Sequence, residues 1–430
     1  MGLTTEPTSE TRRPLNRWPF SFADSRLNPW RGLDGLPREV WLLFATNLIN
    51  RAGMMVLPFL ILYLTTELRF TAGQAGLAFA LYGGAAIIAG PIAGLLSDRI
   101  GALPIMRASL LLSGGVLLLF PLARSRPAVY AITVLWSACT ELFRPASLAA
   151  ITHVVAPAQR KAAYALNRLA INLGMSIGPA LGGFLAAVSF RAMFAVNAVT
   201  TILSGVVLLL AKWESPTSGL VDDADQLDQR SAGRNLVRDG RLIGFLIAAF
   251  LVGIVFYQHE SALPLYMVQY LGLSPAFYGT LFTINTLLIV AFEVRVNRAT
   301  AQWPNEWALF SGCMLFAVGF GALGFVVSAS GILITVVIWT FGEMMLFPAM
   351  AAHLGEIAPE NRRGAYMGAY SMSLSIALTV GPWLGTQLLA TGGPAVVWFI
   401  MFALGAFAAV LMAFAAPHRS SVRAAVAAES

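Results

Sequence analysis

The stretch Gly94-Leu-Leu-Ser-Asp-Arg-Ile-Gly101 decides the fold of this chain. It joins two apolar runs, 72–96 and 103–123, and each run is long enough to cross a bilayer. A carboxylate, Asp98, and a guanidinium, Arg99, stand in this short turn between two spans. Such a link indicates a joint that moves, whereas a loop that only aids solubility would not need both charges. The stretch therefore predicts a membrane protein with mobile spans.

Composition supports this prediction along the whole chain. Of the 430 residues, 57% are hydrophobic and 11% are charged, whereas soluble domains carry about 25% charged residues. Apolar runs of a length that spans a bilayer occur at 39–65, 72–96, 103–123, 127–155, 160–188, 190–211, 242–271, 277–294, 306–327, 331–355, 364–390 and 394–416. We expect an all-α membrane protein with twelve transmembrane helices.

The distribution of basic residues predicts the orientation in the membrane. If both termini are cytoplasmic, the outer loops hold only Arg69, Arg124, Arg126 and Arg191, as the positive-inside rule expects. The net charge of +7 is then a topology signal and a possible contact for lipid headgroups. No basic and aromatic patch points to nucleic acid. The polar, Arg-rich first 37 residues contain no cleavable signal.

The chain divides into two similar halves. Val155-Ala-Pro-Ala-Gln-Arg-Lys-Ala-Ala-Tyr164 matches Ile357-Ala-Pro-Glu-Asn-Arg-Arg-Gly-Ala-Tyr366, which indicates a duplicated unit of six spans. Repeated halves commonly enclose a central site that opens alternately to the two sides. We expect a cytoplasmic tail at 1–38, six-helix bundles at 39–211 and 242–416 around a central cavity, a cytoplasmic linker at 212–241, and a cytoplasmic tail at 417–430. Both cysteines, Cys139 and Cys313, fall inside spans, so no disulfide framework is implied.

The turn at Gly94, Asp98, Arg99 and Gly101 resembles the loop signature after the second span of the major facilitator superfamily. The chain departs from the signature at Ala102 and Leu103, where the family usually has two basic residues. In that family, the aspartate that matches Asp98 engages the start of the eleventh span, where free helix N–H groups attract negative charge. The resemblance therefore implies a latch between the two halves.

A second stretch resembles the fifth-span signature of the antiporter branch of the same family. Gly174-Met-Ser-Ile-Gly-Pro-Ala-Leu-Gly-Gly183 carries Gly174, Gly178, Pro179, Gly182 and Gly183 at the positions of the signature. Independently of the resemblance, small residues every four positions let helix backbones approach closely in lipid, and Pro179 can bend the helix. The same letters fit the Gly-x-Ser-x-Gly nucleophile elbow at Ser176, but that motif requires a strand-to-helix turn.

Charged residues within the spans point to a site. Charges are costly inside a bilayer and usually face water or a partner; here they are Arg51 in the first span, Glu141 and Arg144 in the fourth, Glu260 in the seventh and Glu343 in the tenth. The resemblance implies that these four spans line the central cavity. A carboxyl in a medium of low dielectric constant is easier to protonate, and a nearby guanidinium opposes this. We expect these five residues to couple proton binding to a conformational change.

The position of each charge along its span suggests alternatives to this role. Arg51 and Glu343 lie roughly 18 Å from the starts of their spans, near the middle of the bilayer, and Glu260 lies about 27 Å along its span, towards the outer face. Glu260 could then simply meet water at the outer rim. Glu141 and Arg144 could form a static pair on one helical face. Arg168 and Glu293 are left outside the site, as a pair between halves or as residues near the cytoplasmic surface.

Further polar and aromatic residues in the same spans suit a cavity for an amphipathic small molecule. They are Asn47, Asn50, Tyr257, Gln258, His259, Asn285, Trp339 and Phe347. The histidines show no spacing typical of a metal site, and no phosphate-binding loop is present.

The sequence thus favours a secondary active transporter, driven by a proton gradient and without a cofactor, which exports small amphipathic or drug-like compounds. We expect it as a monomer in a bacterial inner membrane, in contact with lipids. One alternative is a symporter or facilitator that imports a metabolite such as a sugar or peptide. A remote alternative is a membrane enzyme or scaffold without transport, and only Ser176 supports it.

Overall fold

A computed structural model describes residues 35–156, 159–211, 213, 239–359 and 362–415. These residues are almost entirely helical, and none of them forms a β-strand. Within them, ten helical stretches are long and apolar enough to cross a bilayer. The expectation of an all-α membrane protein is confirmed. Most of the predicted tails and linker lie outside the described residues.

The helices follow one another with short connections. The first group comprises α1 (Arg38–Ala52), α2 (Val56–Thr66), α3 (Ala72–Ile100), α4 (Ala102–Leu119), η1 (Phe120–Leu122), α5 (Arg126–Glu141), α6 (Phe143–Val154), α7 (Arg160–Val188) and α8 (Phe190–Leu210). The second group comprises α10 (Gly240–Phe256), η3 (Tyr257–Glu260), α11 (Ala262–Leu265), η4 (Tyr266–Tyr270), α12 (Pro275–Thr300), α13 (Asn305–Ala322), η5 (Leu323–Phe325), α14 (Ala329–Ile357) and α15 (Arg363–Ala415).

Two places explain why ten candidate spans are found where the sequence predicts twelve. The predicted span 127–155 is divided into α5 and α6, and neither piece alone has the length of a span. The helix α15 is 53 residues long and contains Gly393, whose φ of 76° and ψ of −179° are not helical. The chain therefore turns inside α15, directly before Pro394.

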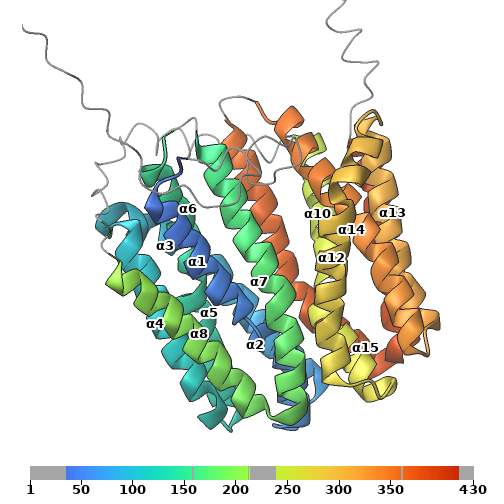
Figure 1. The fold of residues 1–430 in the computed structure, drawn as a ribbon. Helices are drawn as coiled ribbons and strands as arrows, with labels where there is room; N and C mark the ends of the chain where they lie inside the picture. Colours follow the sequence, from blue (N-terminus) through green and yellow to red (C-terminus); the bar gives the residue numbers. More distant parts are fainter. Residues whose placement is uncertain (1–34, 157–158, 212, 214–238, 360–361, 416–430) are drawn as a thin grey trace, which may run out of the picture.

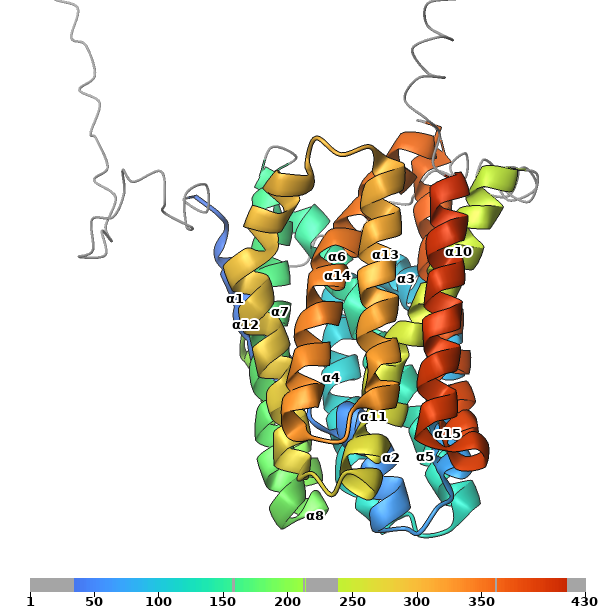
Figure 2. The ribbon, with the colours of Figure 1, turned by 90° about the vertical axis from the view of Figure 1, so that its right-hand side faces the viewer.

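The helices run side by side between two ends of the molecule. We call the end where α8 finishes and α10 begins the linker end; it is at the top of Figure 1. The opposite end, where α2 and α11 lie near the bottom of Figure 2, is called the far end. Five helices begin at the far end with a hydroxyl side chain that accepts a hydrogen bond from the first turn, namely at Thr71, Ser125, Ser189, Ser274 and Ser328. Such caps satisfy N–H groups that the helix itself leaves free.

The stretch Gly94–Gly101 is not a turn over its whole length. The helix α3 continues through Ile100, so Gly94, Asp98 and Arg99 are helical, and the change of direction occurs at Gly101. Gly101 has φ 88° and ψ 154°, a backbone conformation that is open almost only to glycine. The side chain of Asp98 lies outside the described part of the structure, so the latch at Asp98 stays a prediction.

Two seams join the first group of helices to the second group. In one seam α3 packs against α15, and in the other α7 packs against α12. Near the far end the backbones are so close that a Cβ added at Gly76 would lie 3.0 Å from Cα of Trp383, and near the middle of α3 one at Gly83 would lie 2.8 Å from Cα of Thr379. Towards the linker end, a Cβ added at Gly90 or Gly94 would meet nothing within 4 Å. The seam between α3 and α15 is therefore tight at the far end and open at the linker end.

Asp239 fixes the start of α10 at the linker end. Its Oδ1 accepts hydrogen bonds from the N–H groups of Arg241 (3.0 Å) and Leu242 (3.2 Å), and its Oδ2 accepts one of 2.7 Å from the hydroxyl of Tyr366. Burial alone would raise the pKa of Asp239, but these hydrogen bonds outweigh it and lower the pKa below its usual value. The carboxylate thus ties α10 to the first turn of α15.

We expect Gly101→Ala to destabilise the protein by about 1–3 kcal/mol, because a Cβ strains this backbone conformation. Gly94→Ala is the matched control, since Gly94 is helical and has free space around it. Thermal unfolding in detergent measures both variants. Equal melting temperatures for the two would contradict the assignment of the turn to Gly101.

We expect Asp239→Asn to lose about 1 kcal/mol of stability at neutral pH, because asparagine still caps the helix but carries no charge for its N-terminus. A group with a lowered pKa in the folded state stabilises above its unfolded pKa, and this contribution disappears as the pH falls through the folded value. The difference between wild type and variant should therefore shrink below about pH 4. Unfolding measured over a pH series tests this, and a difference independent of pH would refute it.

Candidate functional site

Four spans carry the charged candidate residues, namely the first, fourth, seventh and tenth. In three of them the helix is interrupted next to a charged residue. The first span breaks after Arg51, because α1 ends at Ala52 and α2 begins only at Val56. The N–H groups of Met55 and Val56 are freed by the break, and both donate 3.0 Å hydrogen bonds to Oδ1 of Asn197 in α8. A buried side chain thus replaces the missing helical partners, as broken spans require.

The break in the fourth span separates Glu141 from Arg144. Glu141 is the last residue of α5, and Arg144 is the second residue of α6. In the part of the chain that the structure describes, ion pairs join Arg168 to Glu293 and His259 to Glu260, but none joins Glu141 to Arg144. Leu142, which separates α5 from α6, keeps helical angles of φ −64° and ψ −27°, yet the static pair of Glu141 and Arg144 is not formed.

The seventh span breaks at Glu260, the last residue of the 3₁₀ turn η3. Ser261, which follows, has φ −125° and ψ −79°, outside the helical region. Glu260 is 7% exposed. The structure therefore buries this residue within the bundle, which disagrees with the alternative in which Glu260 lies at the outer rim.

Charged groups from the three broken spans meet in a cavity of about 200 Å³, which we call the Arg51 cavity. Its walls include Asn50, Arg51, Tyr82, Trp136, Glu141, Arg144, Tyr257 and Glu260. Two guanidinium groups and two carboxyl groups thus share one space, so their formal charges cancel when all are ionised. Nη1 of Arg51 contacts Sδ of Met54 at 3.1 Å, while Nε of Arg51 is buried with no hydrogen-bond partner among the described residues.

Glu343 lies in a second, larger cavity of about 340 Å³, which we call the Glu343 cavity. Its walls come from α7, α10, η3, α12 and α14 and include Arg168, His259, Asn285, Glu293, Glu343 and Phe347. Arg168 and Glu293 form an ion pair of 3.5 Å between α7 and α12. Of the two alternatives for Arg168 and Glu293, the pair between the two groups of helices is confirmed, and both residues also line the cavity.

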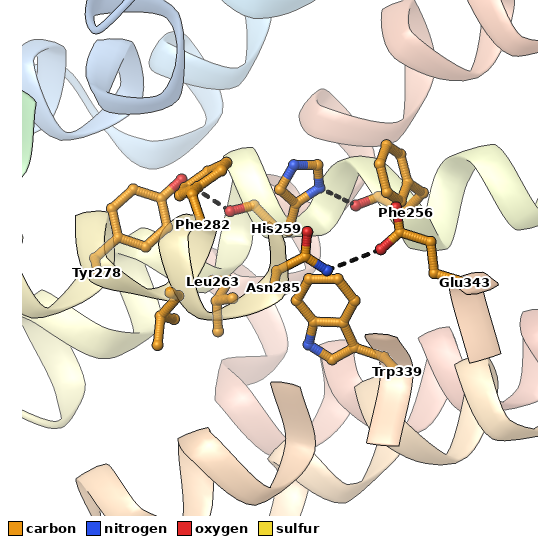
Figure 3. A pocket seen from close by; sticks show the side chains of 9 residues that line it. Phe256, His259, Leu263, Tyr278, Phe282, Asn285, Trp339 and Glu343 are labelled. Carbon is orange, nitrogen blue, oxygen red and sulfur yellow. Dashed lines mark hydrogen bonds between the residues drawn. The ribbon is translucent and has the colours of Figure 1, made fainter. Parts of the chain in front are cut away.

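A side pocket of about 50 Å³ adjoins the Glu343 cavity and shares Glu343, His259 and Asn285 with it. Figure 3 shows the amide of Asn285 between the ring of Trp339 and the carboxyl of Glu343. Nδ2 of Asn285 donates to Oε2 of Glu343 at 2.9 Å and to the hydroxyl of Thr340 at 3.0 Å. The carboxyl is thus held in one orientation against mainly aromatic walls.

Most of the polar and aromatic candidates line one of these spaces. Asn50 and Tyr257 line the Arg51 cavity. Trp339 lines the side pocket, and Phe347 lines the Glu343 cavity. His259 and Asn285 line both the side pocket and the Glu343 cavity. Asn47 and Gln258 do not line these spaces.

Asn47 and Gln258 instead hold helices together. Nδ2 of Asn47 donates to Oδ1 of Asn167 in α7 at 2.9 Å and to the carbonyl of Leu43 at 3.0 Å. Nε2 of Gln258 donates to the carbonyl of Gly381 in α15 at 2.9 Å. Both side chains are buried, at 2% and 0% exposure, so the structure gives them a packing role.

The glycine motif of α7 packs against the first span and against α12. A Cβ added at Gly174 would lie 2.8 Å from the backbone nitrogen of Ala52, and one at Gly178 would lie 2.7 Å from the carbonyl oxygen of Arg51. A Cβ at Gly182 would lie 2.9 Å from Cβ of Met55, and one at Gly183 would lie 2.6 Å from the carbonyl oxygen of Pro275. Pro179 lies inside α7, and its carbonyl oxygen is close to Gly279. The predicted close approach of helices is confirmed.

Ser176 has no nucleophile elbow around it. It lies inside α7, and its hydroxyl donates a 2.7 Å hydrogen bond to the carbonyl of Leu173 in the same helix. The strand-to-helix turn that the motif requires does not occur at this position.

Several residues that line the cavities were not predicted. Tyr82 and Trp136 line the Arg51 cavity, and their ring centroids are 5.1 Å apart. Phe256 and Phe282 line the Glu343 cavity and contact His259. The chain has 27 Phe, 10 Trp and 10 Tyr residues, and nothing in their positions distinguishes these four from the rest.

Comparison with known proteins identifies the family. A model of the Major Facilitator Superfamily matches residues 42–274 and 245–429. The chain therefore belongs to this superfamily of membrane transporters, and the resemblance seen in the sequence is confirmed.

Relatives and solved structures agree with this assignment. An uncharacterized MFS-type transporter, YqjV of Bacillus subtilis, is 26% identical over 87% of this chain and 93% of its own length. A Na(+), Li(+), K(+)/H(+) antiporter of Planococcus maritimus is 24% identical over 78% and 85%. The multidrug resistance protein MdtH of Salmonella typhimurium is 21% identical over 90% and 96%. The crystal structure of a POT family transporter shares the fold, with a TM-score of 0.75 and 16% identity over 90% of this chain and 98% of that one.

We expect Asn47→Ala to destabilise the protein by about 1–3 kcal/mol, because it leaves the buried oxygen of Asn167 without this donor. Asn50→Ala, one helical turn away at the Arg51 cavity, should have a smaller effect. Denaturant or thermal unfolding of the purified variants measures both. If Asn47→Ala were as stable as wild type, the packing role would be refuted.

Proposed function

We propose that this protein is a proton-coupled antiporter that exports small amphipathic, drug-like compounds by alternating access. The proton gradient supplies the energy, and no cofactor takes part. The protein works as a monomer in a bacterial inner membrane, surrounded by lipid, with both termini in the cytoplasm. The linker end then faces the cytoplasm, and the far end faces outwards.

The observation that carries this proposal is the Glu343 cavity. A cavity with mainly apolar and aromatic walls and a few placed polar groups suits an amphipathic compound. In the wall of this space the carboxyl of Glu343 is held by Asn285, while that of Glu293 is paired with Arg168. The carboxyl of Glu343 is a group that can bind and release a proton. Cargo and proton can therefore act on the same group, and this is the requirement for exchange.

Twelve spans in two six-helix repeats fit the observed helices. The candidate spans number ten, α5 with α6 supplies one further crossing, and the turn at Gly393 divides α15 into two crossings. The repeats would be residues 39–211 and 242–416, joined by the linker at 212–241. The two seams, α3 with α15 and α7 with α12, then lie between the repeats.

The seams support alternating access. At the far end, Gly183 and Gly279 allow α7 and α12 to touch through their backbones. Further towards the linker end, the hydroxyl of Thr283 donates to the carbonyl of Ser176 at 2.7 Å, and beyond it the Arg168–Glu293 ion pair bridges the two helices. An exposed ion pair contributes little stability. The linker end can thus open and close at a low energetic cost while the far end is sealed.

Each group has a role in the exchange cycle. Protons that enter from outside neutralise Glu343 or Glu141, and the cargo is released outwards. After the cavities open to the cytoplasm, the protons leave there. Arg51 and Arg144 disfavour protonation of the nearby carboxyls when they are close, so a change in their distance changes proton affinity. The relatives that are named as multidrug resistance and cation/proton antiporters support this direction.

We expect Glu343→Gln to abolish proton-driven transport while the fold is kept, because glutamine keeps the hydrogen bond to Asn285 but cannot bind a proton. Loss of a coupling free energy of about 1–3 kcal/mol lowers the gradient-driven accumulation ratio roughly 5- to 150-fold. Everted vesicles energised by a pH gradient, with ethidium as the probe, measure this ratio. Glu67→Gln, which changes an exposed carboxylate at the end of α2, is the control.

The vesicle measurements also distinguish an exporting antiporter from the alternative, an importer. Ethidium accumulation in everted vesicles together with proton release from them indicates exchange. Uptake of a sugar or peptide together with protons into right-side-out vesicles would instead indicate an importer. Unchanged coupling in Glu343→Gln would remove Glu343 from the proposed role.

A further inference from the structure

The turn η3 forms a wall between the two cavities. A 3₁₀ helix has three residues per turn, so residues three apart lie on the same side. Tyr257 and Glu260 accordingly both line the Arg51 cavity. His259, between them in sequence, lines the Glu343 cavity and its side pocket. Two neighbouring titratable residues therefore face two different spaces.

These two residues also contact each other through the wall. Nε2 of His259 lies 3.8 Å from Oε1 of Glu260. Nδ1 of His259 lies 2.6 Å from the carbonyl oxygen of Phe256, as Figure 3 shows. A carbonyl oxygen can only accept, so Nδ1 carries a hydrogen. The variable proton site of the ring is then Nε2, the atom that faces Glu260.

The backbone holds this geometry in place. The hydroxyl of Tyr278 donates to the carbonyl of His259 at 2.9 Å, and the ring of Phe256 lies 4.5 Å from the imidazole ring, centroid to centroid. The amide of Gln258, between Tyr257 and His259, is anchored to α15. The pair is therefore positioned from both sides of the wall.

We propose that His259 and Glu260 share one proton and pass it between the Glu343 cavity and the Arg51 cavity. In one form, Glu260 is a neutral carboxylic acid and the imidazole is neutral. In the other form, the O–H bond of Glu260 is broken and an N–H bond is formed at Nε2, which leaves a carboxylate and an imidazolium. No other bond changes, and the pair keeps its net charge. The 3.8 Å distance closes by a small side-chain movement or through one water molecule.

The position of the proton changes the charge that each cavity experiences. The ion-pair form presents a carboxylate to the Arg51 cavity and an imidazolium to the Glu343 cavity. The charged and titratable groups around Glu260 are Arg51 from α1, Tyr82 from α3, Glu141 from α5, Arg144 from α6 and Tyr257 from η3; those around His259 are Arg168 from α7, Tyr278 and Glu293 from α12, and Glu343 from α14. The guanidinium groups on one side and the carboxyls on the other both favour the ion pair. Protonation of Glu343 removes part of this support, so the two cavities influence each other through one proton.

This inference rests on the proposed function for its physiological meaning, since only a proton-driven carrier needs such a path. The sharing of one proton by His259 and Glu260 can be tested without any transported compound. The full-length protein is reconstituted in vesicles of phosphatidylcholine and phosphatidylglycerol, and carboxyl protonation is followed by infrared difference spectroscopy over a pH series. The infrared band of a protonated carboxyl that is missing in Glu260→Gln is assigned to Glu260.

We expect the protonation of Glu260 to move about one pH unit higher in His259→Asn, that is, to an about tenfold lower proton concentration. The reason is that the asparagine amide can replace the Nδ1 donor, but nothing replaces the imidazolium. His353→Asn is the matched control, because His353 is buried in α14 and lines neither cavity. An unchanged Glu260 titration in His259→Asn would overturn the proposal, as would an equal shift in His353→Asn.

A transport measurement separates this proposal from the proposed function. In the same vesicles, with ethidium as the probe, His259→Asn should lose proton-driven transport about tenfold and keep ethidium–ethidium exchange at equal pH. If wild type exchanges no protons at all, the antiporter function fails, while the infrared titration still decides the shared proton. Equal losses of both transport modes in His259→Asn would show a merely structural role and contradict the relay.

Discussion

The structure depends on one constraint, that every backbone polar group inside an apolar bundle needs a partner. Unbroken helices meet it by themselves, but here three spans are broken at charged residues. At the first break, Asn197 in α8 accepts from both freed N–H groups; at the seventh, the hydroxyl of Tyr278 in α12 donates to the carbonyl of His259. Each repair is made by a helix from elsewhere in the chain. The breaks that create the cavities therefore also join the helices around them.

The breaks give the cavities their chemistry. At the seventh break, neighbouring side chains face different spaces. The turn η3 does this with Tyr257, His259 and Glu260. The result is two spaces of different character: one holds two guanidinium and two carboxyl groups, and the other has mainly apolar and aromatic walls around Glu343 and the Arg168–Glu293 ion pair. They are separated by two side chains in contact.

The sequence predicted the spans, the charged helices and the glycine contacts well, because these follow from hydropathy and residue size. It predicted neither the helical course of Gly94–Ile100 nor the packing roles of Asn47 and Gln258. The direction of a side chain depends on the rotation of its helix and on breaks within it. Apolar letters such as Met54–Met55 and Leu142 contain no signal for a break, since the partners that permit it lie more than a hundred residues away. For the same reason, the meeting of His259 and Glu260 with two different cavities was not predictable.

The repair of the first break by α8 has a consequence for biosynthesis. When the first span leaves the ribosome, Asn167 and Asn197 have not yet been made. The N–H groups of Met55 and Val56 cannot yet have the partner that they have in the complete bundle, so the break after Arg51 cannot be stabilised in the same way. The first span therefore reaches the conformation seen here only once α8 has emerged.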